Sequence, residues 1–426
     1  MTRRLLALLT AALASALLAG PPARAQDPSA AETAELINNL LGSLLGFRDL
    51  SGAELQEEVA ELGGVPFRRE VPLEYMSRRE LGAYLKELMD SEYPEARAKT
   101  DQRTLVGFDL LSPDTDLRAL RAKVLEENVA GFYDERPGRK RLYAVSEDQR
   151  LTPSNQLVLA HELRHALQDQ YADVHGALPA SVGDYDDRRI AFLSLLEGDA
   201  TLVMERFLVA RLPGVGGDAG MPDLSDLSLP APPVPGVPPV VRDQLVMPYV
   251  AGRDLARAIL KAQGLGGLKE AWSRPPRSTE QVLHPERYAE GEEPRPVDLA
   301  YVPPRATPLN EGVLGELLVR TLLEDATPQA ASEGWGGDRY RVWDLGGRTL
   351  LVWRSVWDTP RDAEEFLAAA LARFGRRLSS QGRLHGFAVF GRGAWSYALG
   401  TQAGGVVLVS SDDADALERA VAWHGR

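Results

Sequence analysis

The sequence predicts an α+β protein with a helical N-terminal part and a separate two-layer α/β domain at its C-terminal end. Three observations lead to this prediction. Apolar residues recur at helical spacing over much of residues 32–127. Short alternating segments, typical of strands, begin near residue 129 and again after residue 310. Residues 212–240 hold eight prolines and five glycines, which predict an exposed loop or linker.

The first part of the chain, residues 26–127, is expected to be mainly helical. Leucines at helical spacing predict one helix near Leu36 to Leu44, and a second contains Leu81, Leu85 and Met89. A third amphipathic stretch runs over 117–125, and residues 70–76 are compatible with a short strand. This region is expected to pack on the domain that follows it.

The central part, residues 128–300, begins with a predicted hairpin. Residues 129–134 and 141–145 have strand patterns, and Pro137-Gly138 supplies the turn. Thr152 can cap a following helix and Pro153 fits its first position, so we expect that helix over 153–171. Two further helical regions are expected, at 188–212 and within 243–290.

The C-terminal part, residues 310–426, has a different texture and carries six of the seven tryptophans. A hairpin is expected around Gly346-Gly347, and Thr359-Pro360 opens a helix. Further strands at 387–391, 394–399 and 405–410 precede a final helix that begins at Asp412. We expect the tryptophans to pack in the core of this domain; the alternative is an exposed binding surface for glycan or protein.

Composition excludes several classes of function. The 426 residues are 44% hydrophobic and 26% charged, an ordinary globular balance. There is no cysteine, so thiol catalysis, thiolate metal sites and disulfides are excluded. The formal net charge of −13 argues against a nucleic-acid partner, because binding to phosphates requires a basic surface. Any metal ligands must therefore be His, Asp or Glu.

Residues 1–25 predict a secretory signal peptide. Arg3 and Arg4 precede an apolar stretch over 5–19, and Ala23-Arg24-Ala25 gives an A-x-A site with cleavage after Ala25. The alternative, an uncleaved anchor, is disfavoured because the stretch is shorter than the roughly 20 residues that span a bilayer. We therefore expect an exported bacterial protein, periplasmic or extracellular, with no transmembrane span after cleavage.

The segment His161-Glu162-Leu163-Arg164-His165 carries the clearest chemical signal. Residues four apart lie on one face of a helix, so His161 and His165 can both reach one zinc ion. Glu162 stands where its carboxylate can meet a water molecule instead of the metal. The alternative is a helix whose histidines merely form ion pairs with Glu162 or Asp169.

Zinc in a catalytic site needs a third protein ligand. Glu197 is the best candidate, because it is an acid in the middle of a helix otherwise rich in apolar residues, where burial is costly unless the carboxylate is paired or bound to metal. The alternative for Glu197 is an ion pair with an arginine such as Arg164. Asp184 is a weaker rival as the third ligand, and His175 lies after the expected end of the helix.

Taken together, His161-Glu162-x-x-His165 with Glu197-Gly198-Asp199-Ala200 resembles the gluzincin branch of the zincin metallopeptidases. More narrowly, residues 161–170 resemble exported bacterial zincin-like proteins that read His-Glu-Leu-x-His-Ala-Leu-Gln-Asp-Gln. The likeness extends to residues 129–134 and 278–285. It implies a zincin-like metallopeptidase domain within 128–300, one zinc ion per chain, and a peptide or protein substrate.

The resemblance also implies catalytic roles. Glu162 is expected to act as general base on a zinc-activated water and then to protonate the leaving amine. His284 and Tyr288 are the candidate donors to the oxyanion, because gluzincins draw this donor from the region after the third ligand. The alternative is that this region is architectural, since Ser278-x-x-Gln281 is a good helix capping box.

Two further expectations concern the surroundings of the metal. Gluzincins often place an aspartate four residues after the third ligand to orient the first histidine; Thr201 stands there in this chain, so Asp199 or Asp169 is expected to take that role. Zincins also commonly bind an extended peptide along a sheet edge. The segment that we expect at that edge, unless it is an internal strand, is Ala130, Gly131, Phe132 and Tyr133.

The sequence thus favours an exported zinc-dependent metallopeptidase. The alternative is a catalytically silent zincin scaffold that serves as a binding or assembly protein of the cell envelope. An intact Glu162 favours the enzyme, because a scaffold that needs only zinc has no use for the base.

Overall fold

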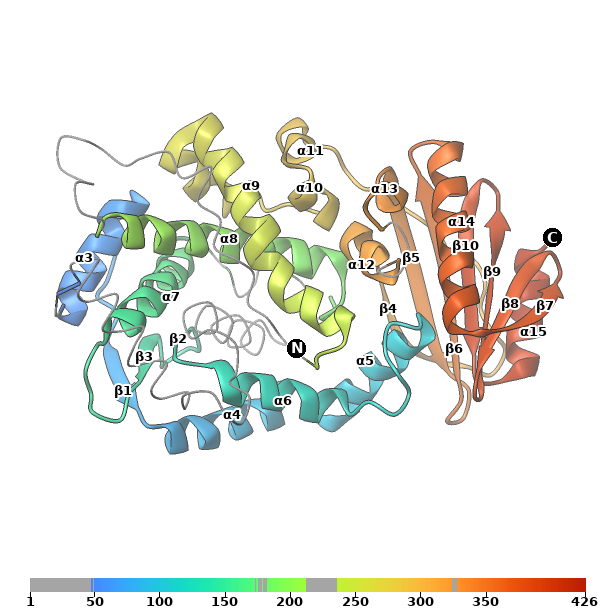
Figure 1. Cartoon of the computed structure of the whole chain (residues 1–426), viewed down its shortest axis with the longest axis horizontal. Helices are drawn as coiled ribbons and strands as arrows, with labels where there is room; N and C mark the ends of the chain where they lie inside the picture. The colour runs from blue at the N-terminus through green and yellow to red at the C-terminus, as the bar shows by residue number, and fades with distance from the viewer. Residues whose placement is uncertain are drawn as a thin grey trace.

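The computed structural model describes residues 47–48, 50–172, 174, 178, 182–211, 236–323 and 328–426. The expected signal peptide with its cleavage site, the helix near Leu36 to Leu44, most of the Pro/Gly-rich segment and His175 lie outside the described residues. The fold is mixed α+β, with helices in the N-terminal part and a separate antiparallel sheet at the C-terminal end (Figure 1). Among the described residues, no helix combines the length and apolar character needed to cross a membrane.

The N-terminal part contains four described helices and one strand of a small sheet, whose other two strands belong to the central part. The helices are α3 (Gly52–Gly63), α4 (Arg78–Glu92), α5 (Glu95–Gly107) and α6 (Leu117–Asn128). The sheet has the order β1-β3-β2, in which β1 (Leu73–Met76) runs parallel to β3 (Arg141–Val145) and β2 (Gly131–Asp134) runs antiparallel to it. The predicted hairpin and short strand are confirmed, and the strand joins the hairpin in one sheet.

Three long helices lie above this sheet in Figure 1: α7 (Pro153–Tyr171), α8 (Asp187–Val209) and α9 (Pro239–Ala271). Helix α7 begins as predicted, because the Thr152 side chain accepts a hydrogen bond from Asn155 N and Pro153 occupies the first position. Helices α8 and α9 touch backbone to backbone, since a Cβ atom on Gly198 would lie 2.0 Å from Gly252. Two short helices follow, α10 (Thr279–Leu283) and α11 (Pro285–Glu290).

The C-terminal sheet has seven antiparallel strands in the order β4-β5-β6-β10-β9-β8-β7. Its strands are β4 (Thr307–Gly312), β5 (Trp335–Asp344), β6 (Thr349–Trp357), β7 (Ser379–Leu384), β8 (Phe387–Arg392), β9 (Trp395–Gln402) and β10 (Gly405–Ser411). Helices α12 (Gly315–Leu322) and α13 (Pro328–Ser332) lie between β4 and β5. The predicted strands are all present, but the sequence did not predict β4 and β7.

Helices cover both faces of this sheet. Helix α14 (Pro360–Arg377) packs on one face, through apolar residues such as Phe366, and α15 (Ala414–His424) packs on the other, through Leu417. The expectation of two layers was therefore wrong: alternate residues of the central strands are buried on opposite sides, so each side requires its own cover. Five of the six tryptophans of this region are buried, as core packing predicts.

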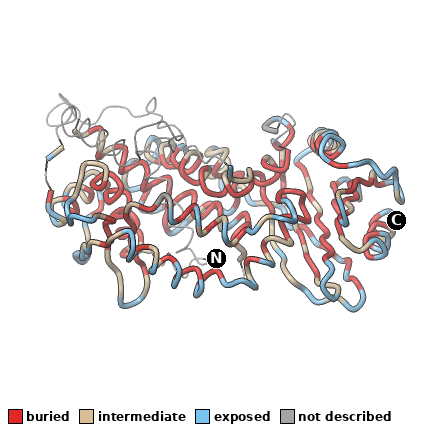
Figure 2. The backbone as a smooth tube through the Cα atoms, turned by 60° about the horizontal axis from the view of Figure 1, so that its bottom comes forward, coloured by how far each residue is buried: buried red, intermediate tan, exposed pale blue. Residues whose placement is uncertain are grey.

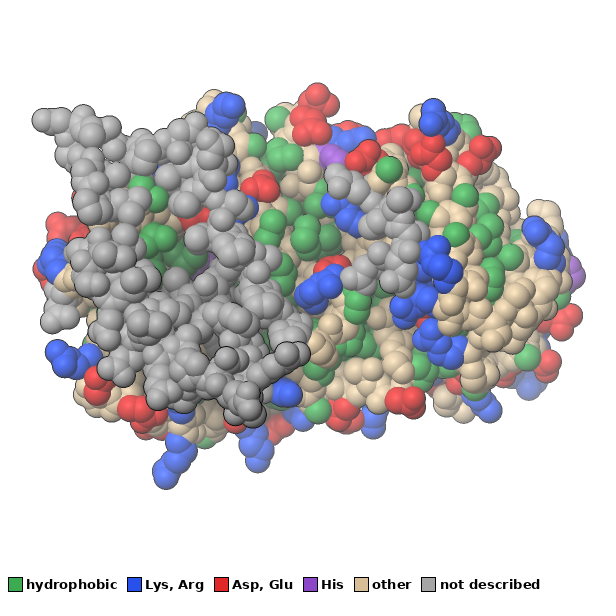
Figure 3. Space-filling model, in the orientation of Figure 1, with side chains coloured by type: hydrophobic (Ala, Val, Ile, Leu, Met, Phe, Trp, Pro, Cys, Tyr) green, Lys and Arg blue, Asp and Glu red, His purple; other side chains and the backbone are tan. Residues whose placement is uncertain are grey.

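The sheet domain docks on α5. The buried Asp109 forms ion pairs with Arg373 of α14 at 2.8 Å and with Arg392 of β8 at 2.9 Å. Tyr397 donates a hydrogen bond to Val106 O, at 2.9 Å. Figure 3 shows Lys and Arg side chains gathered beside the lower end of α14, and Figure 2 shows buried backbone running from the helical part into the sheet. The two parts therefore share a continuous core.

Candidate metal centre

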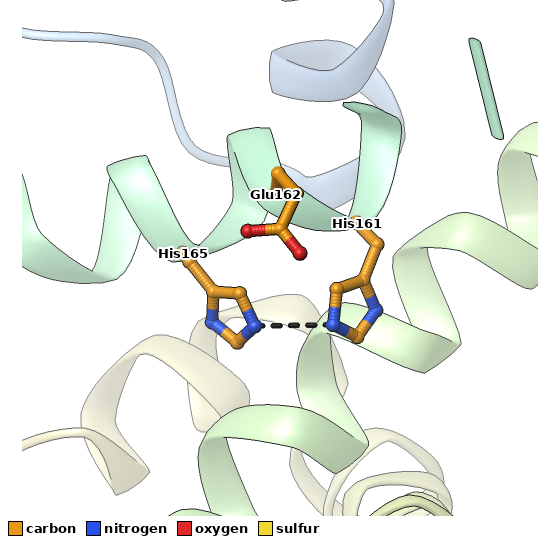
Figure 4. A group of neighbouring side chains, drawn as sticks. All are labelled: His161, Glu162 and His165. Atoms are coloured by element: carbon orange, nitrogen blue, oxygen red, sulfur yellow. Dashed lines mark hydrogen bonds between the residues drawn. The ribbon is translucent and has the colours of Figure 1, made fainter. Parts of the chain in front are cut away.

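Helix α7 presents His161, Glu162 and His165 to one place, as Figure 4 shows. All three are buried, and each offers a possible ligand atom within 4.8 Å of the others. The Nε2 atoms of His161 and His165 lie 3.1 Å apart. This is the arrangement that the spacing of four residues predicts.

Helix α8 brings Glu197 to the same point. Its Oε2 atom lies 3.1 Å from His161 Nε2 and 3.2 Å from His165 Nε2. Tetrahedral coordination with bonds of about 2.0–2.1 Å separates neighbouring ligand atoms by about 3.3 Å. The three atoms therefore have the chemical character and the mutual spacing that fit a zinc ion.

The hydrogen bonds of Gln168 fix the tautomer of His165. The Nε2 of Gln168 donates to Leu196 O and to Asp199 Oδ2, both at 3.0 Å. The Oε1 of Gln168 must therefore accept a hydrogen bond from His165 Nδ1, at 2.9 Å. When neutral, His165 then points the lone pair of its Nε2 at the Glu197 carboxylate. Such an arrangement requires a positive charge where these atoms converge, either a proton on His165 or a metal ion.

The pKa directions agree with this need for positive charge. Burial lowers the pKa of His165, but the carboxylates of Glu197 and Glu162 outweigh burial and raise it to about 9. Burial alone would raise the pKa of Glu197, yet the two histidines hold it well below its usual range. The pKa of His161 is lowered, chiefly by burial. The pocket thus keeps an anionic carboxylate beside two imidazoles.

A buried ion pair holds α7 against α8. Arg164 donates to both oxygens of Asp199, at 2.8 and 2.9 Å, and both side chains are fully buried. Trp272, just after α9, donates to Asp199 Oδ2 at 2.9 Å, and Arg164 also reaches Gly63 O at the end of α3. Arg164 therefore pairs with Asp199 and leaves Glu197 to the histidines, so the alternative ion pair between Arg164 and Glu197 is not formed.

Glu162 is divided between the sheet and the pocket. Its Oε2 accepts a hydrogen bond from the backbone N–H of Tyr133, at 2.9 Å, whereas its buried Oε1 has no hydrogen-bond partner among the described residues. Burial raises the pKa of Glu162 to about 8. A carboxyl group whose pKa lies close to neutrality, with one oxygen held and the other unengaged, is suited to proton transfer.

Strand β2 lies at the edge of the described three-stranded sheet, which excludes the internal position within that sheet. Its residues are buried, and the N–H of Tyr133 that faces away from β3 is already bonded to Glu162. Whether Ala130 to Tyr133 bind a substrate stays a prediction; any peptide added there must pair through other backbone groups of the edge.

The two aspartates that we expected to orient His161, Asp199 and Asp169, contact other residues instead. Asp199 reaches the second histidine, His165, through Gln168. Asp169 accepts hydrogen bonds from Tyr133 Oη, at 2.8 Å, and from Lys140 Nζ. The hydroxyl of Thr201 and the Nδ1 of His161 are both buried without a hydrogen-bond partner among the described residues.

The remaining candidates make contacts away from the three ligands. His284 lies at the junction of α10 and α11 and pairs with Glu316 at 3.1 Å. Tyr288 donates to Arg274 O at 2.8 Å and lines a cavity of about 510 Å³ that also includes Phe192 of α8. Their role as oxyanion donors stays a prediction. Asp184 is held by Arg97 and Arg121, which accounts for its burial without a metal.

A second group of acids carries its own counter-ion. Glu280, Glu292 and Asp358 offer oxygens close to one another. The guanidinium of Arg287 lies 3.1, 2.7 and 3.2 Å from these three side chains in turn. Of these two groups in the described part of the chain, the one on α7 is buried throughout, whereas in the other Glu292 is half-buried and Asp358 is exposed.

Sequence reasoning missed two residues of the site. The ring of Tyr249, from α9, stacks on His161 with centroids 5.6 Å apart and an interplanar angle of 16°. Gln168 orients His165, as described above. Gln168 lies three residues after His165, so helical spacing could have indicated it. Nothing near His161 in the sequence points to Tyr249.

Comparison with known proteins gives a match to a family model over the C-terminal part of the chain. Residues 305–420 match a domain of unknown function (DUF8575). No curated protein and no solved structure matches the chain. The matched residues contain the seven-stranded sheet, while α7 and α8 lie outside them. The match therefore assigns no activity to the candidate metal centre.

Proposed function

We propose that this protein is an exported zinc-dependent metallopeptidase that hydrolyses peptide bonds. The observation that carries the proposal is the meeting of His161 Nε2, His165 Nε2 and Glu197 Oε2 within 3.1–3.2 Å of one another. Two imidazoles and one carboxylate are a ligand set of catalytic zinc sites that leave a position open. The zincin-like character of the domain, the zinc ion and the export remain parts of this proposal.

The three ligands would hold the ion, and zinc, when bound, supplies a Lewis acid that acidifies water and polarises a carbonyl group. The residues of the chain supply the remaining steps. Glu162 Oε1 takes a proton from the attacking water and delivers it to the leaving amine, while Tyr133 N–H keeps the carboxylate in place. Gln168 keeps the lone pair of His165 directed at the ion.

The test compares three variants of buried glutamates. In Glu162→Gln we expect zinc to be retained and casein hydrolysis to fall by about 10²–10⁴-fold, because the general base is lost. In Glu197→Gln we expect the zinc content to fall, because a ligand is lost. Glu205→Gln is the matched control. Glu205 lies on α8, as Glu197 does, and is buried, but it pairs with Arg257, so zinc and activity should persist.

Metal content is measured by mass spectrometry on the samples used for hydrolysis. A wild-type protein that is free of zinc and cannot be reloaded would overturn the proposal. Stoichiometric zinc without hydrolysis of any peptide would favour the silent scaffold, whose role is binding or assembly.

A further inference from the structure

The two histidines of the centre are supported in different ways. His165 donates its Nδ1–H to Gln168, and Gln168 is in turn fixed by Leu196 O and Asp199. His161 has no such chain: its Nδ1 is buried and has no hydrogen-bond partner among the described residues. On the side away from Glu197, its ring is therefore held by packing and not by a hydrogen bond.

Tyr249 supplies that packing. Its ring lies nearly parallel to the His161 imidazole, with an interplanar angle of 16° and 5.6 Å between centroids. The contact between Gly198 and Gly252 explains how α9 comes so close, because a side chain at either position would collide with the backbone of the other helix. Helices α8 and α9 cross closely here, and each brings one residue to His161: Glu197 from α8 and Tyr249 from α9.

From this geometry we infer that Gln168 and Tyr249 are the positioning residues of the centre. Gln168 selects the tautomer of His165 that presents a lone pair at Nε2. Tyr249 holds the plane of the His161 ring. The inference rests on the proposed function in so far as the centre binds a metal. Its distinctive feature is that one ligand is oriented by a hydrogen-bonded chain and the other by an aromatic ring.

The first test measures zinc affinity, by competition with a chelating indicator, in Gln168→Met and Gln170→Met. Gln168→Met keeps the length of the side chain but removes the acceptor for His165, so we expect zinc to bind about 10–100-fold more weakly. Gln170→Met is the matched control: Gln170 is also buried on α7, but its amide bonds to the backbone of Arg68 and Arg69. Affinity there should be unchanged.

The second test separates the ring of Tyr249 from its hydroxyl. Tyr249→Phe keeps the stack, so zinc affinity should stay close to that of the wild type. Tyr249→Leu removes the stack, and we expect a loss of about 2–10-fold, the range that aromatic pairs contribute. The visible spectrum of the Co²⁺-loaded protein should change in Tyr249→Leu and in Gln168→Met, because an altered ligand direction alters the coordination geometry, and should be retained in Tyr249→Phe.

These measurements distinguish failure of the metal centre from failure of the positioning roles. If the wild type binds neither Zn²⁺ nor Co²⁺, the metal centre itself fails. If the wild type binds both metals and Gln168→Met and Tyr249→Leu bind them with unchanged affinity and spectrum, the centre stands and the positioning roles are refuted. A loss of affinity in Gln170→Met equal to that in Gln168→Met would likewise refute a specific role. Thermal melting of the metal-free variants confirms that each is folded.

Discussion

Helices α7 and α8 bury several charged side chains beside one another, whereas the C-terminal domain buries five of its six tryptophans. On α7 Arg164 is fully buried, and on α8 Asp199 is equally inaccessible. In the sheet, Trp335 and Trp353 occupy comparable positions deep in the core. Burying a charge costs free energy unless it is paired, and burying an aromatic ring gains it. The buried rings of the sheet therefore stabilise the fold, whereas the buried charges of the helical layer are tolerated because they are paired.

The difference also shows in how each region holds its elements together. In the helical layer Asp199 alone receives hydrogen bonds from Arg164, Gln168 and Trp272, which come from α7 and from the end of α9. In the sheet, Trp357 stacks on Phe366 at 4.6 Å and 24°, with contacts that are mainly apolar. A network of charges specifies directions for its members, which is what metal ligands need. An apolar core specifies shape.

The largest effect is expected from breaking this network. Arg164→Leu leaves Asp199 as a fully buried acid without its ionic partner, and we expect the free energy of unfolding to fall by about 3–5 kcal/mol. Chemical denaturation of the metal-free protein measures the change. In the sheet domain, Arg361→Leu removes an exposed partner of Glu365 on α14 and should leave stability unchanged. Equal losses in the two variants would contradict the comparison.

A smaller, pH-dependent effect is expected from Asp338, on strand β5 of the sheet. This buried carboxylate accepts hydrogen bonds from Leu314 N, Gly315 N and Trp335 Nε1, but burial dominates and raises its pKa to about 6. The folded state then binds its proton more tightly than the unfolded state, whose pKa is 3.8. The contribution to stability is therefore constant below about pH 4, falls as the pH rises through about 4–6, and is level above that range.

The full drop corresponds to about 3 kcal/mol at 1.36 kcal/mol per pKa unit. Asp338→Asn removes the titration, so the difference in unfolding free energy between wild type and variant should change across pH 4–6. It is measured by denaturation at a series of pH values. A difference that is constant with pH would show that the donors around Asp338 compensate for its burial in full.

Much of the candidate site could be predicted from sequence because it is local. The two histidines and Glu162 lie within five residues of one helix, and Thr152-Pro153 indicates where that helix begins. Glu197 could be found because an acid among apolar residues of a helix needs a reason to be there. Tyr249 could not be found, since it reaches His161 through the crossing at Gly198 and Gly252, and no local pattern encodes a contact between two helices.

There is a physical reason why two strands could not be predicted from the sequence. Strands β4 and β7 are the two edges of the seven-stranded sheet. Neither has a face fully buried in the core: the residues of β7 are almost all exposed, and β4 begins with exposed residues that include Pro308. Without a buried face there is no alternation of apolar residues to detect. The central strands, with both faces covered, were found.

The smallest effect is expected from a feature that both regions share, the capping box at the start of a helix. Helices α7 and α14 each begin with Thr-Pro and a capping box, in which Thr152 accepts from Asn155 N at 3.2 Å and Thr359 from Asp362 N at 3.3 Å. Thr152→Ala and Thr359→Ala should each lower the unfolding free energy by about 1 kcal/mol, because each leaves the same backbone donor without its partner.

Serine at either position keeps the hydroxyl and serves as the control. Zinc affinity should be unchanged in all four variants, since Thr152 lies more than two helical turns before His161 and makes no described contact with it. A loss of affinity confined to Thr152→Ala would show that the metal centre depends on the start of its helix as well as on the charges around it. The contrast between the two regions would then extend from their buried side chains to the stability of the helices that carry them.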